Sequence, residues 1–182
     1  MISDRKLTEN FTLYEFLRSN IAERNPSIKK KQFSPNSDVL RNLQLTAELL
    51  QKVRDLCNKE IDSNIVIHIT SGYRCPDLNK LVNGSKTSDH MYGRAADFKL
   101  YTSKSGKYEE VDGATYKKLV ELLYHNKDIK FYQLIKEFGT RSKPAWIHLS
   151  QRYLLNQNGR QFLEIGSHTN NKYKILDLEK WT

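Results

Sequence analysis

The stretch Ser88-Asp-His-Met-Tyr-Gly-Arg-Ala-Ala-Asp97 takes the chain from a loop into a strand and carries polar groups with it. Gly93 lets the chain turn, so that His90 before it and Asp97 after it can converge. A second histidine, His148, lies much further along the chain. Two imidazoles and one carboxylate from separate stretches are a donor set that zinc accepts, with a fourth position left for water. We therefore predict a zinc site whose geometry differs from the helical His-Glu-x-x-His pattern.

Hydrophobic periodicity around this stretch predicts the rest of the fold. We expect strands over residues 65–70, 95–100, 131–138 and 145–150. We expect helices over residues 11–19, 37–58, 77–82 and 114–125, with the polar, proline-punctuated stretch 20–36 as a loop. In the second strand, Asp97 and Lys99 share one face and Phe98 lies on the other. These elements make an α+β fold, a small, mainly antiparallel sheet with helices packed against it and the zinc site on the sheet.

Polar residues with capping chemistry mark where the helices begin. Thr12 and Glu15 have the spacing of a capping box at the start of the first helix. Ser37 or Asp38 can cap the long second helix, and Asp112 can cap the last one.

The size of the chain, 182 residues and 21.3 kDa, suits one domain over residues 1–182. We expect its core over residues 10–150, with 151–182 as a C-terminal extension that adds a hairpin or a clasp. No run approaches the 18 or so apolar residues of a membrane span, and no apolar run follows the charged start. We therefore expect a protein made in the cytoplasm without a signal peptide. Cys57 and Cys75 are too few for a disulfide scaffold, so we expect unpaired thiols, with a single disulfide between the two as the alternative.

The net charge of +9 and the pI of about 9.4 have two interpretations. One is a lysine-rich solvated surface, and the other is attraction to a polyanion, either nucleic acid or an anionic cell wall. The lysines are scattered, and the run Lys29-Lys30-Lys31 falls in the expected loop. The sequence lacks an element on which arginine and lysine cluster with interleaved aromatic residues, the pattern that nucleic-acid binding favours. Nucleic acid is therefore not the expected partner.

A series of motifs runs in order through the expected core. They are Ser71-Gly-Tyr-Arg-Cys-Pro76, Asn79, Val82, Gly84, Ser88-Asp-His90, Gly93-Arg-Ala-Ala-Asp97, Gln133-Leu-Ile-Lys-Glu137 and Trp146-Ile-His-Leu-Ser150. In this order and spacing the motifs resemble the M15 family of zinc peptidases, which cleave peptides containing D-amino acids in bacterial cell walls. The segment Phe11-Thr-Leu-Tyr-Glu-Phe16 also resembles the first helix of the short, phage-type members. The specificity lies in the ordered set rather than in any one motif.

The resemblance implies a role for several residues. It implies that His90, Asp97 and His148 are zinc ligands, that Arg74 polarises the scissile carbonyl, and that Ser88 contacts the substrate near the metal. The implied substrates are the stem peptides of peptidoglycan. The implied setting is a phage-type lysin that acts at the bacterial cell wall after its release. Both carboxypeptidase and endopeptidase cleavage fit the resemblance.

One position departs from the family pattern. Many relatives carry Glu or Asp three residues before the last histidine ligand, where this chain has Ala145. The nearest upstream carboxylate is Glu137, on the neighbouring predicted strand, and it is our candidate for the catalytic base. Tyr92 and Trp146 are candidates for lining the substrate pocket, with plain packing as the alternative. Ala145 also supports an alternative function, a catalytically degenerate metal-binding or virion-structural module with the same fold.

Each candidate residue also has a structural interpretation. Alone, His90 would be an exposed loop histidine and His148 a core histidine with a hydrogen bond. Asp97 is bracketed by apolar residues, and a buried carboxylate needs a partner. The alternative ion pairs are Asp97 with Arg94, Arg74 with Asp77, and Glu137 with Lys136 or a basic neighbour. Finding His90, Asp97 and His148 in the right order favours the metal over these alternatives.

Overall fold

The computed structural model of the protein describes residues 5–181, which contain a seven-stranded sheet. Its strands are β1 (Ile65–Ser71), β2 (Ala95–Lys104), β3 (Lys107–Glu110), β4 (Gln133–Glu137), β5 (Trp146–Ser150), β6 (Gln161–Ile165) and β7 (Lys174–Ile175). The strand order is β1-β2-β5-β4-β6-β7, and β3 pairs with β2. All neighbours are antiparallel except β4 and β6. The predicted α+β fold with a mainly antiparallel sheet is therefore confirmed.

The two faces of the sheet differ in chemistry. Phe98 and Leu100 of β2 are fully buried and pair with Ile69 and Ile67 of β1, so apolar side chains line one face. Because side chains alternate along a strand, Asp97 points to the opposite face. This second face is hollowed, and the candidate site lies on it.

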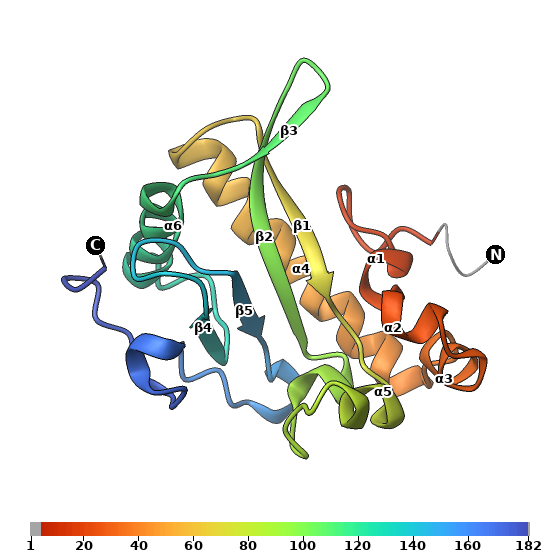
Figure 1. The fold of residues 1–182 in the computed structure, drawn as a ribbon. Helices are drawn as coiled ribbons and strands as arrows, with labels where there is room; N and C mark the ends of the chain where they lie inside the picture. Colours follow the sequence, from red (N-terminus) through yellow and green to blue (C-terminus); the bar gives the residue numbers. More distant parts are fainter. Residues whose placement is uncertain (1–4, 182) are drawn as a thin grey trace.

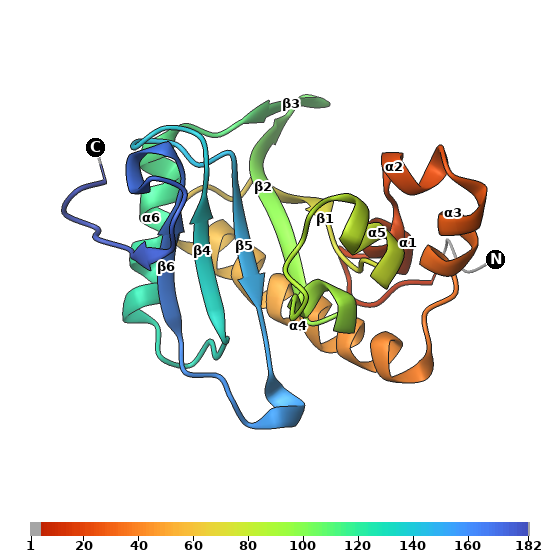
Figure 2. The same ribbon diagram turned by 60° about the horizontal axis from the view of Figure 1, so that its bottom comes forward.

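Two helices cover the apolar face, as Figures 1 and 2 show for α4 (Ser37–Glu60) and α6 (Gly113–His125). The side-chain oxygen of Asn36 accepts a hydrogen bond of 2.9 Å from the Val39 N–H, so the N-cap of α4 is Asn36 and not Ser37 or Asp38 as predicted. Asn caps a helix as well as Ser or Asp does, so residue type alone does not choose among the three. The predicted cap of α6, Asp112, is confirmed.

The N-terminal region is more helical than the sequence predicts. Its helices are α1 (Leu13–Leu17), α2 (Asn20–Glu23) and α3 (Pro26–Gln32). The predicted capping box of Thr12 and Glu15 is present at α1. The prediction of a loop over 20–36 was wrong, because Asn25 caps α3 and Pro26 suits its first position. The run Lys29-Lys30-Lys31 therefore lies in the last turn of a helix, where cations are favourable.

Gln32 ties this region to the loop that carries Arg74. Its side chain is fully buried, and its amide nitrogen donates to the carbonyls of Leu17, at 2.9 Å, and Tyr73, at 2.6 Å. Its amide oxygen accepts from the Cys75 N–H at 2.9 Å. Every polar atom of this side chain thus has a partner, and α3 is fixed by tertiary contacts rather than by periodicity.

Three other boundaries differ from the predictions. β2 runs on to Lys104, because its polar end pairs with β3 in a hairpin that turns at Ser105 and Gly106. β4 is shorter at both ends than the predicted strand 131–138. In the C-terminal segment, β6 joins the sheet parallel to β4, and β7 pairs antiparallel with β6. This segment therefore contributes strands to the sheet, which is more than the predicted hairpin or clasp.

Short helices complete the structure: α5 (Pro76–Leu81), which the sequence predicted, and the 3-10 turns η2 (Asp89–Tyr92), η3 (Tyr153–Leu155) and η4 (Ser167–Thr169). Within residues 5–181, no helix is both long enough and apolar enough to cross a membrane. Cys57 and Cys75 are buried free thiols, as predicted, and burial raises the pKa of Cys57 to about 12.

Candidate metal centre

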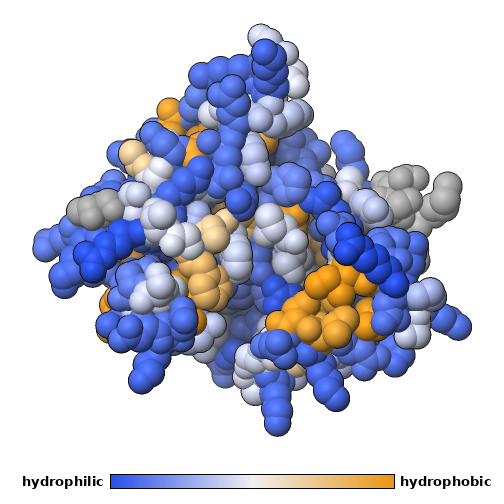
Figure 3. All heavy atoms as spheres, in the orientation of Figure 1, coloured by the Kyte–Doolittle hydropathy of each residue, from blue (hydrophilic) through white to orange (hydrophobic). Residues whose placement is uncertain are grey.

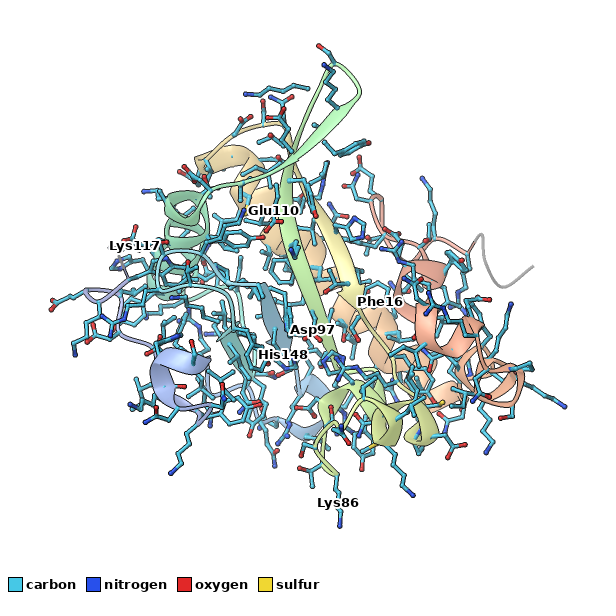
Figure 4. All side chains as sticks on the ribbon, viewed as in Figure 1. Phe16, Lys86, Asp97, Glu110, Lys117 and His148 are labelled. Atoms are coloured by element: carbon cyan, nitrogen blue, oxygen red, sulfur yellow. The ribbon has the colours of Figure 1, made fainter. Side chains whose placement is uncertain are left out.

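The register between β2 and β5 brings two candidate ligands together. Asp97 is the direct antiparallel partner of His148, so both side chains leave the sheet on its hollowed face. Figure 4 shows the two residues side by side, one from each strand. His148 Nδ1 lies 2.9 Å from Asp97 Oδ1.

The third candidate, His90, is placed by the turn η2. Gly93 ends this turn with a φ of 68°, the left-handed conformation that glycine adopts most readily. His90 is buried, and its Nε2 lies 3.1 Å from Asp97 Oδ1 and 3.2 Å from His148 Nδ1. The predicted convergence of the loop histidine with the strand carboxylate is therefore present in the structure.

The distances within this cluster fit a metal ion. The three ligand atoms lie within 4.8 Å of one another, and the closest contacts are 2.9, 3.1 and 3.2 Å. Zinc bonds of about 2.0–2.1 Å at tetrahedral angles place ligand atoms roughly 3.3 Å apart. The donor atoms are thus already spaced almost as they would be around one ion.

The hydrogen bonding of His90 also favours a cation. Its Nδ1 lies 2.6 Å from the carbonyl oxygen of Gly72, which can only accept, so Nδ1 carries the proton. Burial lowers the pKa of His90, against the opposing charge of Asp97, and keeps the ring neutral. The lone pair of Nε2 then faces the carboxylate oxygen of Asp97. His90 Nε2 and Asp97 Oδ1 are both electron-rich, so a cation between them would stabilise their short separation. In many metal sites the ligand histidine likewise donates its other N–H to a backbone carbonyl.

Charge in the cluster favours the ionised carboxylate. Burial would protonate Asp97, but the neighbouring imidazoles, with His148 Nδ1 placed to donate at 2.9 Å, outweigh it and hold the pKa of Asp97 well below its usual range. Burial likewise disfavours the charged form of His148, but the hydrogen bond and charge of Asp97 outweigh it and raise the pKa of His148. A ligand imidazole is neutral, so a proton and a metal ion compete for His148, and the raised pKa makes metal binding weaker at lower pH.

Arg74 holds the second oxygen of the Asp97 carboxylate. Its Nη2 donates to Asp97 Oδ2 at 2.6 Å, and its Nε donates to Ser71 Oγ at 2.8 Å. The predicted alternative partner of Arg74, Asp77, instead pairs with Lys31 at 2.6 Å. Arg74 therefore orients the carboxylate while its guanidinium faces the cavity.

The other predicted ion pairs are also not formed. The guanidinium of Arg94 lies 4.9 Å above the ring of Tyr92, so Arg94 is not the partner of Asp97. Lys136 points to the opposite face of the sheet from Glu137, and its ammonium donates to the carbonyl of Arg141. Arg94 therefore does not neutralise Asp97, and Lys136 does not neutralise Glu137.

Glu137 reaches the same cavity from β4, the strand next to β5. It is the register partner of Trp146, whose indole Nε1 donates to Glu137 Oε2 at 2.9 Å. Burial, together with the negative charge of Asp97, raises the pKa of Glu137, while His148 and the Trp146 hydrogen bond oppose the shift. The backbone N–H of Ala145 donates to the Glu137 carbonyl at 3.0 Å. The departure at Ala145 therefore lies beside the carboxylate that could replace it.

The three candidate ligands line a cavity of about 1210 Å³. Of the predicted substrate-contacting residues, Ser88 and Trp146 line it, and Tyr92, with an exposed side chain, does not. Figure 3 shows a hydrophobic patch on the surface, at the place where Figure 1 shows α2 and α5. Apolar side chains of these two helices line that end of the cavity. The cavity-lining residues that the sequence did not single out include Arg18, Ile21, Tyr132, Arg152, Leu163 and Tyr173.

Arg152 forms one wall of the cavity. Its Nε donates to both carboxylate oxygens of Asp89, at 3.1 and 3.2 Å, and its guanidinium lies 3.7 Å from the centre of the Tyr132 ring. Asp89 immediately precedes His90, so this pair connects the loop of one ligand to the chain that follows β5. No sequence signal marked Arg152, because the pair joins segments that are far apart in the chain.

We expect Gly72→Ala to lower both the free energy of unfolding and the affinity for zinc. A Cβ at this position would lie 2.5 Å from the carbonyl oxygen of Phe16 and 2.6 Å from its Cα, and such overpacking typically costs about 1–3 kcal/mol. Moving the Gly72 carbonyl would also release the His90 ring, and losing such a partner lowers metal affinity about 10–100-fold. Thermal unfolding and a competitive zinc titration measure the two effects.

The matched control is Gly159→Ala, because a Cβ there meets no atom within 4 Å. Unchanged zinc affinity in Gly72→Ala would show that the Gly72 carbonyl does not fix the His90 ring.

Two histidines and one aspartate that face one cavity, with a further carboxylate nearby, resemble the three protein ligands that catalytic zinc sites use to leave one position open. The model of the Peptidase M15 family matches residues 9–130, and the chain belongs to the M15 family of metallopeptidases. The match covers Arg74, His90 and Asp97 and ends before Glu137 and His148. No curated protein matches the chain. The resemblance drawn from the motifs is thus confirmed at the level of the family.

Proposed function

We propose that the protein is a zinc peptidase that hydrolyses D-amino-acid-containing peptide bonds of bacterial peptidoglycan, in the manner of a phage-type lysin. The observation that carries the proposal is the cluster of His90, Asp97 and His148 at ligand spacing inside a cavity large enough for a peptide. Family membership supports metal-dependent peptide cleavage. The positive net charge of +9 supports attraction to an anionic cell wall, where we propose that the protein acts after release.

Zinc is our choice of metal because imidazole and carboxylate are ligands that it accepts, and because three protein ligands leave one position open. When bound, zinc supplies a Lewis acid that lowers the pKa of water to about 7. The groups that hold the candidate ligands support the same choice. Gly72 fixes the tautomer of His90, and Arg74 orients Asp97, as the outer partners of zinc ligands commonly do.

The residues of the cavity divide the remaining work. The Glu137 carboxylate takes a proton from water and delivers it to the leaving amine, and a raised pKa suits a group that must do both. The Arg74 guanidinium faces the same cavity and stabilises the negative charge that develops on the carbonyl oxygen. Ser88 and Trp146, which line the same cavity, contact the substrate.

We also propose that residues 1–182 form one domain. β6 and β7 belong to the same sheet as the strands that carry the ligands, so the C-terminal segment is part of the domain and its residues can serve the site.

The second candidate is a degenerate module that binds metal without turnover. The observation in its favour is Ala145, because it stands where many relatives carry a carboxylate, while Glu137 is held by the Trp146 indole. In that case the protein would bind zinc and cell-wall peptides and release no product.

Release of new amine groups from purified peptidoglycan tests the proposal. We expect release by the zinc-loaded protein, its loss after treatment with a chelator, and its return with added zinc. Mass spectrometry of the products separates free D-alanine, the product of a carboxypeptidase, from larger fragments. A protein with one zinc per chain that releases no amines would overturn the catalytic proposal and favour the degenerate module.

A further inference from the structure

Tyr173 lines the metal-site cavity from the C-terminal segment. It lies beyond residues 9–130, which match the family, and no motif in the sequence marked it. A single exposed tyrosine on a surface is ordinary. Tyr173 differs because it shares a cavity with Glu137 and the candidate ligands.

The sheet register places Tyr173 in the same row as Glu137. The recorded pairs are Glu137 with Ile165 between β4 and β6, and Glu164 with Lys174 and Leu163 with Ile175 between β6 and β7. The same register carried one residue further sets Tyr173 opposite Ile165. Two strand spacings, roughly 10 Å, then separate the backbones of Tyr173 and Glu137.

The same register decides the face on which Tyr173 lies. Leu163 lines the cavity, so Ile165, two residues on, shares its face. Directly paired residues point to the same side of a sheet. Tyr173 therefore leaves the sheet on the hollowed face and is long enough to lean across Ile165 toward Glu137.

The backbone around Tyr173 is anchored although the residue is 61% exposed: the Lys172 N–H donates to the Thr169 carbonyl at 3.2 Å, and Lys174 pairs with Glu164 of β6. Beyond β7, Trp181 is buried, and its indole Nε1 donates to the Ser142 carbonyl at 2.6 Å. The Trp181 carbonyl accepts from Lys117 Nζ at 3.2 Å, and Lys136 Nζ lies 4.3 Å from the centre of the ring. Because the backbone is already fixed, a peptide that binds the exposed aromatic side chain loses little conformational entropy from ordering the protein.

We propose that Tyr173 is a substrate-binding residue whose hydroxyl donates a hydrogen bond to a carbonyl or carboxylate oxygen of the peptide bound beside Glu137. This inference rests on the proposed peptidase function of the same site. In the part of the chain that the structure describes, no hydrogen bond occupies the Tyr173 hydroxyl, so it is available to a ligand. Partial burial of the hydroxyl end of the ring, with the negative charges of Glu137 and Asp97, raises the pKa of Tyr173, and the hydroxyl is a proton donor at neutral pH.

Tyr173→Phe tests the proposal, because it removes the hydroxyl and keeps the ring. We expect kcat/KM for peptidoglycan fragments to fall about five- to tenfold, mostly through KM, with unchanged zinc content and unchanged Tm. The matched control is Tyr108→Phe on β3, which is 67% exposed and lies outside the cavity, and it should behave as the wild type. Kinetics within twofold of the wild type in Tyr173→Phe would overturn the proposal.

A binding measurement separates failure of this inference from failure of the proposed reaction. Calorimetric titration of soluble peptidoglycan fragments into zinc-loaded Glu137→Gln requires no turnover. Adding Tyr173→Phe to that variant should weaken binding by the same five- to tenfold. Equal affinities in the two proteins, or no binding by either, would overturn the role of Tyr173 whether or not the wild type cleaves.

Discussion

His148→Ala is expected to lose zinc binding and peptidase activity together. The imidazole supplies one of three donor atoms spaced as a metal requires, and Asp97 cannot replace it because its second oxygen already binds Arg74. Losing only the outer partner of a ligand lowers metal affinity or activity by up to about 100-fold, so loss of the ligand itself should exceed that. Metal analysis and amine release from peptidoglycan, measured on the same samples, check both effects.

Thermal unfolding adds a readout that does not depend on the reaction. At a free zinc concentration about 1,000 times Kd, binding to the native state stabilises the wild type by about 4 kcal/mol. His148→Ala should show little of this zinc-dependent rise in Tm. The control is His125→Ala, an exposed histidine at the end of α6 whose ring contacts only Tyr124 among aromatic groups of residues 5–181. If His148→Ala still binds one zinc per chain, His148 is not a ligand and is instead a core histidine.

The sequence predicted that the candidate ligands converge because each of them lies on a segment with a strong local signal. His90 and Asp97 flank a glycine that permits a turn, and His148 lies in an apolar strand. What local signals could not provide was the pairing of β2 with β5, which are not consecutive in the chain. That pairing sets Asp97 opposite His148, and only the resemblance to a family anticipated it.

The elements that the sequence missed are those stabilised by distant contacts. α3 has little periodicity, and its end is fixed by Gln32 through hydrogen bonds to Leu17, Tyr73 and Cys75. Short helices gain most of their stability from tertiary packing, so their local sequence carries a weak signal. The parallel pairing of β6 with β4 is likewise non-local, and it brings Tyr173 to the cavity.

Glu137→Gln is expected to lower kcat about 10²–10⁴-fold while zinc content stays at the wild-type level. The substitution keeps the shape and the hydrogen bond to the Trp146 indole, but an amide cannot take a proton from water. The matched control is Glu109→Gln on β3, an exposed carboxylate outside the cavity, which should leave kcat unchanged. Single-turnover kinetics together with metal analysis distinguish a lost base from a lost metal.

Ala145→Glu in the Glu137→Gln background extends this test. The backbone N–H of Ala145 donates to the Glu137 carbonyl, so the two positions lie side by side where β4 ends and β5 begins. If Glu137 has taken over the work of the family carboxylate, a glutamate at 145 should restore part of the lost turnover. If Glu137→Gln cleaves as fast as the wild type, Glu137 is not the base. If only proteins with Ala145→Glu cleave, the natural chain is the degenerate module, with the metal ligands in place and the proton acceptor missing.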